Sequence, residues 1–309
     1  TRTVVLRALL GADLGPFSAN IDHAWTIINQ HIGESFWSLG LTDWLPTAKY
    51  RQFEAARAVL RGAVDHVISQ RRSSPSADGD LLSMLLSARD EETGEAMTDE
   101  QLRVEVTTFL LAGQETTSLA LTWTWYLLSQ DAASQRRLEQ EIDTVLKGRP
   151  PEYADLVNLP YTRMVIDESM RLYPPAWGFS RQALSDDELG GFHLPRGWLA
   201  FVIPYVLHRL PAYWQDPDVF DPERFLPERS VDLPKFAYLP FGAGPRQCIG
   251  NQFALIEAQL IVATLVQGYR LHLVPGSKVE PWALITLRPR FGMPMMIERR
   301  APWPIAAAV

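Results

Sequence analysis

The sequence has 309 residues, of which 47% are hydrophobic and 21% charged, a net charge of −7 and a single cysteine. This length is sufficient for a large hydrophobic core, and the composition is that of an ordinary globular protein. The acidic balance argues against nucleic acid as the main partner. One cysteine excludes an internal disulfide framework and an iron–sulfur cluster held by several thiolates. The six histidines show no paired metal-ligand spacing.

The chain opens at Thr1, inside a pattern that already resembles a helix interior, and without an initiator methionine. We therefore expect an N-terminal part to be absent from this sequence, so that a targeting segment or membrane anchor cannot be read from it. A cytoplasmic location without a membrane partner is the expectation from the remaining chain.

The first part of the chain is predicted to be helical. Asp80 is expected to cap the last of its short helices. Four ranges show apolar residues at helical spacing: 1–10, 21–38, 48–72 and 81–89.

The longest periodic segment covers residues 98 to about 130 and begins with Thr98 and Gln101 at capping-box spacing. At 1.5 Å per residue, a helix of this length extends on the order of 50 Å, enough to cross a domain. Gln114 and Glu115 lie in its middle and weigh against a membrane span. We expect a buried central helix.

The middle of that helix carries the segment Ala112-Gly113-Gln114-Glu115-Thr116-Thr117. A glycine inside a helix costs about 1 kcal/mol relative to alanine, which suggests a kink or a close approach by a bulky group. The Thr116 hydroxyl can bond a preceding carbonyl. A carboxylate followed by a hydroxyl could relay protons, whereas the plainer interpretation is a packing glycine beside an incidental polar patch.

The second part of the chain mixes helices with short strands. The helix near the end is expected to turn Phe253, Ile256, Leu260, Ile261 and Leu265 inward. The predicted elements are helices at 131–147, 162–172 and 251–267, short strands within 176–204, a proline-rich meander at 216–230, and paired strands within 269–299.

The only cysteine, Cys248, lies in the glycine-containing loop 241–250. A lone cysteine is most often a small buried hydrophobe. Here glycines loosen the loop, Pro245 stiffens it, and Arg246 places a cation two residues before the sulfur. Because a helix is predicted directly after Gly250, the sulfur is expected at a positive helix end, where a thiolate can serve as a metal ligand or nucleophile.

This loop resembles the haem-binding signature of the cytochrome P450 family, Phe-x-x-Gly-x-Arg-x-Cys-x-Gly. Three further segments resemble motifs of the same family, and they occur in the family's order. The matched positions are Phe241, Gly244, Arg246, Cys248 and Gly250 for the loop, 112–117 for the oxygen-activating helix, Glu168 and Arg171 for the Glu-x-x-Arg helix, and 222–225 for the Pro-Glu-Arg-Phe segment.

The resemblance implies a mainly helical fold with small sheets, in one cytochrome P450 catalytic domain over 1–309 whose N-terminal portion is absent. Its helical part, 1–130, would end in the central helix, and 131–309 would hold the Glu-x-x-Arg helix, meander, cysteine loop and C-terminal sheet. It implies haem b as cofactor, with Cys248 as the axial ligand of the iron. Thr116 and Glu115 would deliver protons to dioxygen as the catalytic residues.

The same resemblance implies roles for further residues. Arg246 and Arg181 would bind the haem carboxylates. The remaining cofactor contacts would be Phe241, Gly242, Gly250, Ala112 and Gly113; the substrate contacts Phe109, Ala112, Ala176, Trp177, Leu284 and Ile285; and the structural cluster Glu168, Arg171 and Arg224.

The function implied is a haem-thiolate monooxygenase that hydroxylates or epoxidises an apolar small molecule, a fatty-acid-like one among the possibilities. Because no flavin or nicotinamide domain follows the haem region, electrons are expected from a separate ferredoxin or flavodoxin with its reductase. The alternatives are a peroxide-dependent peroxygenase, a rearrangement enzyme, a non-catalytic haem sensor, and a helical protein whose cysteine is merely structural.

Overall fold

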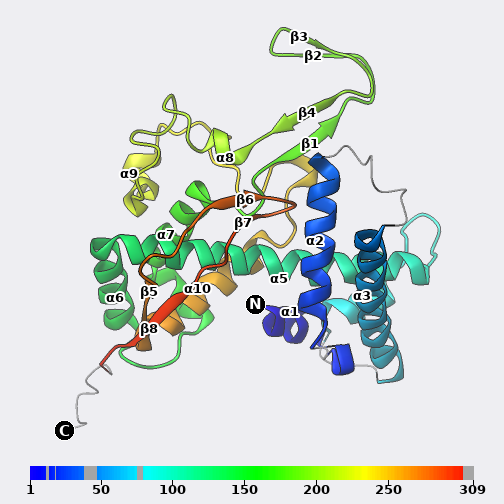
Figure 1. Cartoon of the computed structure of the whole chain (residues 1–309), viewed down its shortest axis with the longest axis horizontal. Helices are drawn as coiled ribbons and strands as arrows, with labels where there is room; N and C mark the ends of the chain where they lie inside the picture. Colours follow the sequence, from blue (N-terminus) through cyan, green and yellow to red (C-terminus); the bar gives the residue numbers. More distant parts are fainter. Residues whose placement is uncertain (12–13, 18, 38–46, 75–78, 302–309) are drawn as a thin grey trace. The chain divides into compact units, whose positions relative to one another are not determined.

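The computed structural model describes residues 1–301 apart from 12–13, 18, 38–46 and 75–78 (Figure 1). The chain forms two compact units. One comprises Thr1–Ser118 with Ala283–Ile285, and the other comprises Leu119–Trp282 with Thr286–Val309. Their boundary falls within the longest helix, α5 (Asp99–Gln130).

The first unit is helical. Its core is built by apolar side chains that α1, α2, α3, α4 and the start of α5 bury together, among them Leu10, Val64, Leu82 and Val106. Helices α2 and α3 pack against each other, as Figure 1 shows. The elements are α1 (Arg2–Leu9), η1 (Gly15–Phe17), α2 (Ile21–Trp37), α3 (Ala48–Ser73), α4 (Leu81–Ser87) and the beginning of α5.

Two predicted helix starts are confirmed by their capping bonds. The Asp80 carboxylate accepts a hydrogen bond from the Ser83 amide at 2.9 Å. Thr98 and Gln101 form the reciprocal capping box: the Thr98 amide donates to Gln101 Oε1 at 2.8 Å, and the Gln101 amide donates to Thr98 Oγ1 at 3.2 Å. These bonds satisfy amides that the first helical turn leaves without partners.

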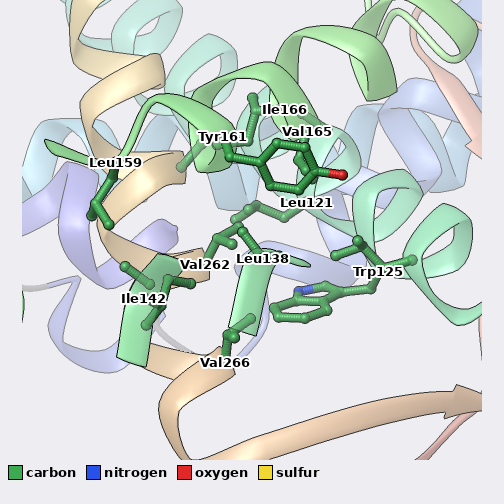
Figure 2. Packing of buried hydrophobic residues seen from close by; sticks show 14 of the residues in the cluster. Leu121, Trp125, Leu138, Ile142, Leu159, Tyr161, Val165, Ile166, Val262 and Val266 are labelled. Carbon is green, nitrogen blue, oxygen red and sulfur yellow. The ribbon is translucent and has the colours of Figure 1, made fainter. Parts of the chain in front are cut away.

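The second unit places α6, α7, α10 and the end of α5 around one apolar core. Figure 2 shows side chains of this cluster, among them Trp125, Leu138 and Val262. The helical elements after α5 are α6 (Ala132–Leu146), η2 (Tyr153–Asn158), α7 (Pro160–Leu172), α8 (Pro204–Leu207), η3 (Pro222–Phe225), α9 (Pro227–Ser230), η4 (Gly244–Arg246) and α10 (Asn251–Gly268).

The strands form small two-stranded sheets, as the resemblance implied. Strand β1 (Phe179–Gln182) pairs antiparallel with β4 (Leu199–Val202), with Phe179 opposite Val202. The remaining pairs are β2 (Asp187–Leu189) with β3 (Phe192–Leu194), β5 (Tyr269–Leu273) with β8 (Met295–Arg299), and β6 (Pro281–Ala283) with β7 (Leu287–Pro289).

The inward face predicted for the last helix is only partly confirmed. All five expected residues are half-buried; Ile261 and Leu265 pack against the core, and the fully buried apolar residues of α10 are offset from the predicted face by one or two positions. Because α10 is apolar almost all the way round, its sequence does not define one face. The apolar residues that it buries are Leu255, Ala258, Val262, Ala263 and Val266.

No helix among the described residues is both long and apolar enough to cross a membrane. Within the same residues, histidine, cysteine, aspartate and glutamate side chains form no group of three or more that could hold a metal ion.

Candidate functional site

The loop 241–250 presents the Cys248 thiol to the surface. Gly242 and Gly244 have φ angles of 68° and 74°, in the left-handed region that favours glycine. The Cys248 amide donates to the Phe241 carbonyl at 3.0 Å and closes the loop. The backbone therefore needs these two glycines in order to hold the thiol in an exposed position.

Helix α10 begins at Asn251, with Gly250, which has no side chain, at its N-cap; the Gln252 amide donates to Asn251 Oδ1 at 2.6 Å. The thiol thus precedes a helix N-terminus, where partial positive charge favours an anion. Gly250 itself has φ −87°, and a Cβ there would lie 3.9 Å from Cys248 Sγ, an ordinary contact. Neither backbone angle nor space explains glycine at position 250, so its role at a cofactor stays a prediction.

Two arginines expected to bind haem carboxylates are exposed. Arg246, on η4, makes no ion pair with any residue that the structure describes. Arg181, on β1, donates to the Ser180 carbonyl at 2.9 Å and lies 5.1 Å above the Phe179 ring. Both guanidinium groups can therefore bind an anion without breaking an ion pair.

The structure brings Glu168, Arg171 and Arg224 into one buried cluster. Arg171 donates to both carboxylate oxygens of Glu168, at 2.7 and 2.8 Å, and Arg224 donates to Glu168 at 3.3 Å. All three side chains are buried. Arg171 comes from the end of α7 and Arg224 from η3, so the carboxylate joins two segments distant in sequence.

The remaining donors of this cluster fix the meander. Arg171 donates to the carbonyls of His208 and Pro217, at 2.8 and 2.7 Å. Arg224 donates to the carbonyls of Gln215 and Asp216. Side-chain donors thus replace the secondary structure that this irregular segment lacks.

In the first unit, the Thr116 hydroxyl donates to the Ala112 carbonyl at 2.5 Å, as its sequence predicted. Ala112 is exposed and Phe109 half-buried, so Phe109, Ala112 and Thr116 share an open face of α5. Gly113 does not share this open face of α5, because it lies against Val5 of α1: a Cβ on Gly113 would lie 3.0 Å from Val5 Cγ2. The close approach inferred for this glycine is therefore supplied by α1, and its contact with a cofactor stays a prediction.

Glu115 is buried and bound by α2. The Trp25 indole N–H donates to its carboxylate, and Asn29 Nδ2 lies 2.9 Å from each carboxylate oxygen. Sequence reasoning missed Trp25 and Asn29. Their four-residue spacing on one helix was the only available signal, and many residue pairs share it.

The residues expected to contact substrate fall in both units. In the first, Leu284 is buried and Ile285 exposed, and Gly33 of α2 allows Leu284 to approach, since a Cβ on Gly33 would lie 2.6 Å from Leu284 Cδ2. In the second, Ala176 is exposed and Trp177 half-buried.

The family model for cytochrome P450 matches residues 12–290, so the chain belongs to the cytochrome P450 family. Cytochrome P450 proteins carry haem b. The identification made from the four motifs is confirmed, and so is the mainly helical fold with small sheets.

Two curated relatives come from Streptomyces melanosporofaciens. A cyclooctatin synthase is 43% identical over 284 residues, which cover 91% of this chain and 62% of that protein. A cyclooctat-9-en-7-ol 5-monooxygenase is 44% identical over 239 residues, which cover 77% of this chain and 52% of that protein. The chain therefore spans between about half and two thirds of the length of these relatives.

The solved structure of the retinoic acid-bound cyanobacterial CYP120A1 has the same fold. It superimposes with a TM-score of 0.87 at 28% identity, over 97% of this chain and 67% of that one.

The residues present fit a haem. An exposed thiol at a helix N-terminus can ligate iron, and the exposed Arg246 and Arg181 can bind carboxylates. In the first unit, the small side chain of Ala112 is exposed on α5.

Proposed function

We propose that this chain is the larger part of a haem-thiolate monooxygenase acting on an apolar, isoprenoid-like small molecule. The observation that carries the proposal is the exposed Cys248 thiol, which two left-handed glycines hold ahead of the N-terminus of α10. A merely structural cysteine would be buried instead, because free cysteine behaves as a small hydrophobe.

The overall reaction consumes the substrate, dioxygen, two electrons and two protons. One C–H bond breaks and a C–O bond forms, while the O–O bond breaks and the second oxygen atom leaves as water. A thiolate-ligated haem supplies the activation of dioxygen, because the sulfur donates electron density that favours O–O cleavage. The protein must hold the thiolate, exclude water and supply the two protons.

Thr116 and Glu115 are assigned to proton supply. Since the Thr116 hydroxyl donates its proton in a hydrogen bond to the Ala112 carbonyl, its oxygen remains able to accept a further hydrogen bond on the open face of α5. Glu115 is held toward α2 by Trp25 and Asn29. Its carboxylate can take up a solvent proton and pass it on after one of these donors releases an oxygen.

The proposed substrate class rests on two observations. The expected contact residues are mostly apolar, with Phe109, Leu284 and Ile285 in the first unit. The name of one relative, the cyclooctat-9-en-7-ol 5-monooxygenase, specifies an unsaturated alcohol as its substrate. The structural neighbour CYP120A1 was solved with retinoic acid bound. A largely hydrocarbon ligand with few polar groups suits such a lining, because apolar burial supplies affinity without directional bonds.

The electrons are assigned to a separate ferredoxin or flavodoxin with its reductase. The alternative is peroxide, which is dioxygen already reduced by two electrons, so that it would supply the oxygen atom and make such a partner unnecessary. The first route requires reductant, a redox partner and dioxygen for turnover, whereas the second requires only peroxide.

The test uses the full-length protein, purified with haem. The reduced carbon monoxide complex should show the thiolate-type Soret band, and Cys248→Ser should abolish it. Cyclic isoprenoids should then be screened for a substrate-induced Soret shift and for oxygenated product with reductant and dioxygen. A normal thiolate band in Cys248→Ser would refute the ligand assignment. Turnover with peroxide, and none with reductant and dioxygen, would show a peroxygenase and refute the proposed monooxygenase.

A further inference from the structure

His208 lies at the junction between the buried Glu168–Arg171–Arg224 cluster and the segment that leads into the cysteine loop. It follows α8 and is completely buried. Its backbone carbonyl accepts a hydrogen bond from Arg171 at 2.8 Å, and its ring Nδ1 lies 3.2 Å from the Arg171 carbonyl. His208 and the end of α7 are therefore joined twice.

The other ring nitrogen reaches a third segment of the chain. The Leu239 amide donates to His208 Nε2 at 2.8 Å. Because a backbone amide can only donate, Nε2 must be the unprotonated nitrogen, and the ring proton must lie on Nδ1, facing the Arg171 carbonyl. Both ring nitrogens are thus satisfied only in one neutral tautomer. Burial also lowers the pKa of His208 to about 4, which keeps the ring neutral.

Leu239 is placed directly before the loop that carries the thiol. Pro240 has no amide hydrogen, so the Leu239 amide is the last donor before Phe241 by which the backbone can be fixed. The Leu239 carbonyl accepts from the Gly242 amide at 3.2 Å, and the Phe241 carbonyl accepts from the Cys248 amide at 3.0 Å. The hydrogen bonds therefore run continuously from His208 to the backbone of Cys248.

The neighbouring residue fixes the same segment from the other side. The Tyr238 hydroxyl donates to the Asp167 carbonyl at 2.9 Å, and its ring centroid lies 5.2 Å from that of His208. Tyr238 is thus held through its side chain, whereas Leu239 is held through its backbone amide by His208. Of these two bonds, the one to His208 fixes the backbone directly at the point where the chain enters the loop.

We propose that His208 is a positioning residue for the Cys248 thiol, acting through the bond from the Leu239 amide to its Nε2. The proposal rests on the proposed function only in naming the thiol as a haem ligand. In this role the acceptor at Nε2 matters for the loop, and the donor at Nδ1 matters for the stability of the α7 junction.

Two substitutions separate these nitrogens. His208→Gln can place an amide oxygen near the Nε2 position and keep the acceptor for Leu239. His208→Asn can place an amide nitrogen near the Nδ1 position and keep the donor to Arg171, but it cannot reach Leu239. Trp214→Phe is the control for packing, because Trp214 lies against the same ring and its buried Nε1 has no hydrogen-bond partner among the described residues.

The readouts are hydrogen exchange at the Leu239 and Cys248 amides and the Soret band of the reduced carbon monoxide complex, all in the full-length protein. We expect His208→Asn to lower the exchange protection of the Leu239 amide about tenfold, since a buried amide loses its acceptor. Part of its Soret band should move from the thiolate type to the thiol type. His208→Gln and Trp214→Phe should keep the parent band.

Equal effects of His208→Asn and His208→Gln, or a larger effect of Gln, would overturn the proposal. If His208→Asn does not fold, the ¹⁵N shifts of the parent ring decide instead: an Nδ1–H tautomer supports the proposal and an Nε2–H tautomer refutes it. A parent protein without any thiolate-type band would remove the proposed function, while the exchange comparison would still decide whether His208 positions the loop.

Discussion

Asn29 Nδ2 lies 2.9 Å from each carboxylate oxygen of Glu115, so that a neutral amide of α2 binds a buried acid of α5. The Trp25 indole, one turn earlier on α2, donates to the same carboxylate. The structure therefore joins the proposed proton donor to a different helix from the one that carries it.

Asn29→Ala is expected to weaken this connection and disturb proton delivery. Loss of a donor to a buried carboxylate should lower the free energy of unfolding by about 1–3 kcal/mol. In turnover, less of the reductant consumed should appear as product. The measurements are denaturant unfolding and the ratio of product to oxidised reductant. Gln30→Ala, which removes only an exposed bond to Glu34, is the control, and equal behaviour of the two variants would contradict the prediction.

The pH dependence of stability should contain a contribution from His208. Its folded-state pKa is about 4, below the ordinary histidine value of 6.5, because burial disfavours the charged ring. Between these values the unfolded chain binds the additional proton, so stability rises with pH. The free energy of unfolding should therefore fall by up to about 3 kcal/mol as pH drops from 6.5 to 4.

The measurement is urea unfolding across that pH range, in the parent and in His208→Gln. The difference between the two proteins isolates the histidine from the carboxylates that titrate nearby in pH. A difference that does not vary between pH 6.5 and 4 would show that His208 titrates normally in the folded protein.

Glu168→Gln is expected to be strongly destabilising. It leaves the buried Arg171 guanidinium without its counter-ion, which typically costs about 3–5 kcal/mol. Glu54→Gln is a matched control, because Glu54 pairs with Arg57 at the same three-residue helical spacing but on the exposed surface of α3. That change should cost only a few tenths of a kcal/mol. Thermal unfolding of both variants decides, and similar losses would contradict the prediction.

Gly244→Ala should strain the cysteine loop. The Gly244 φ of 74° is a left-handed angle, and a side chain there costs about 1–2 kcal/mol although no atom lies within 4 Å of the added Cβ. Gly268→Ala, at the end of α10, also enters open space but without a positive φ. It should leave stability unchanged or raise it. Haem retention and the free energy of unfolding should therefore fall only for Gly244→Ala.

Local sequence signals determined much of this protein. Capping residues such as Asp80, Thr98 and Gln101 predicted where helices begin, because these bonds form between residues three apart in the chain. The glycine pattern around Cys248 and the four spaced motifs were sufficient by themselves to identify the cytochrome P450 family. The residue types and their spacing within each motif can be read directly from the sequence.

Only the tertiary structure decided the contacts between segments distant in sequence. The apolar surface of α10 gave no single inward face, and packing against α6 and α7 selected Leu255, Ala258 and Val262. Trp25, Asn29 and His208 gave no distinctive local signal, since their partners Glu115 and Leu239 lie at least thirty residues away. Buried polar groups must find partners wherever the fold provides them, and that choice is made only when the helices pack.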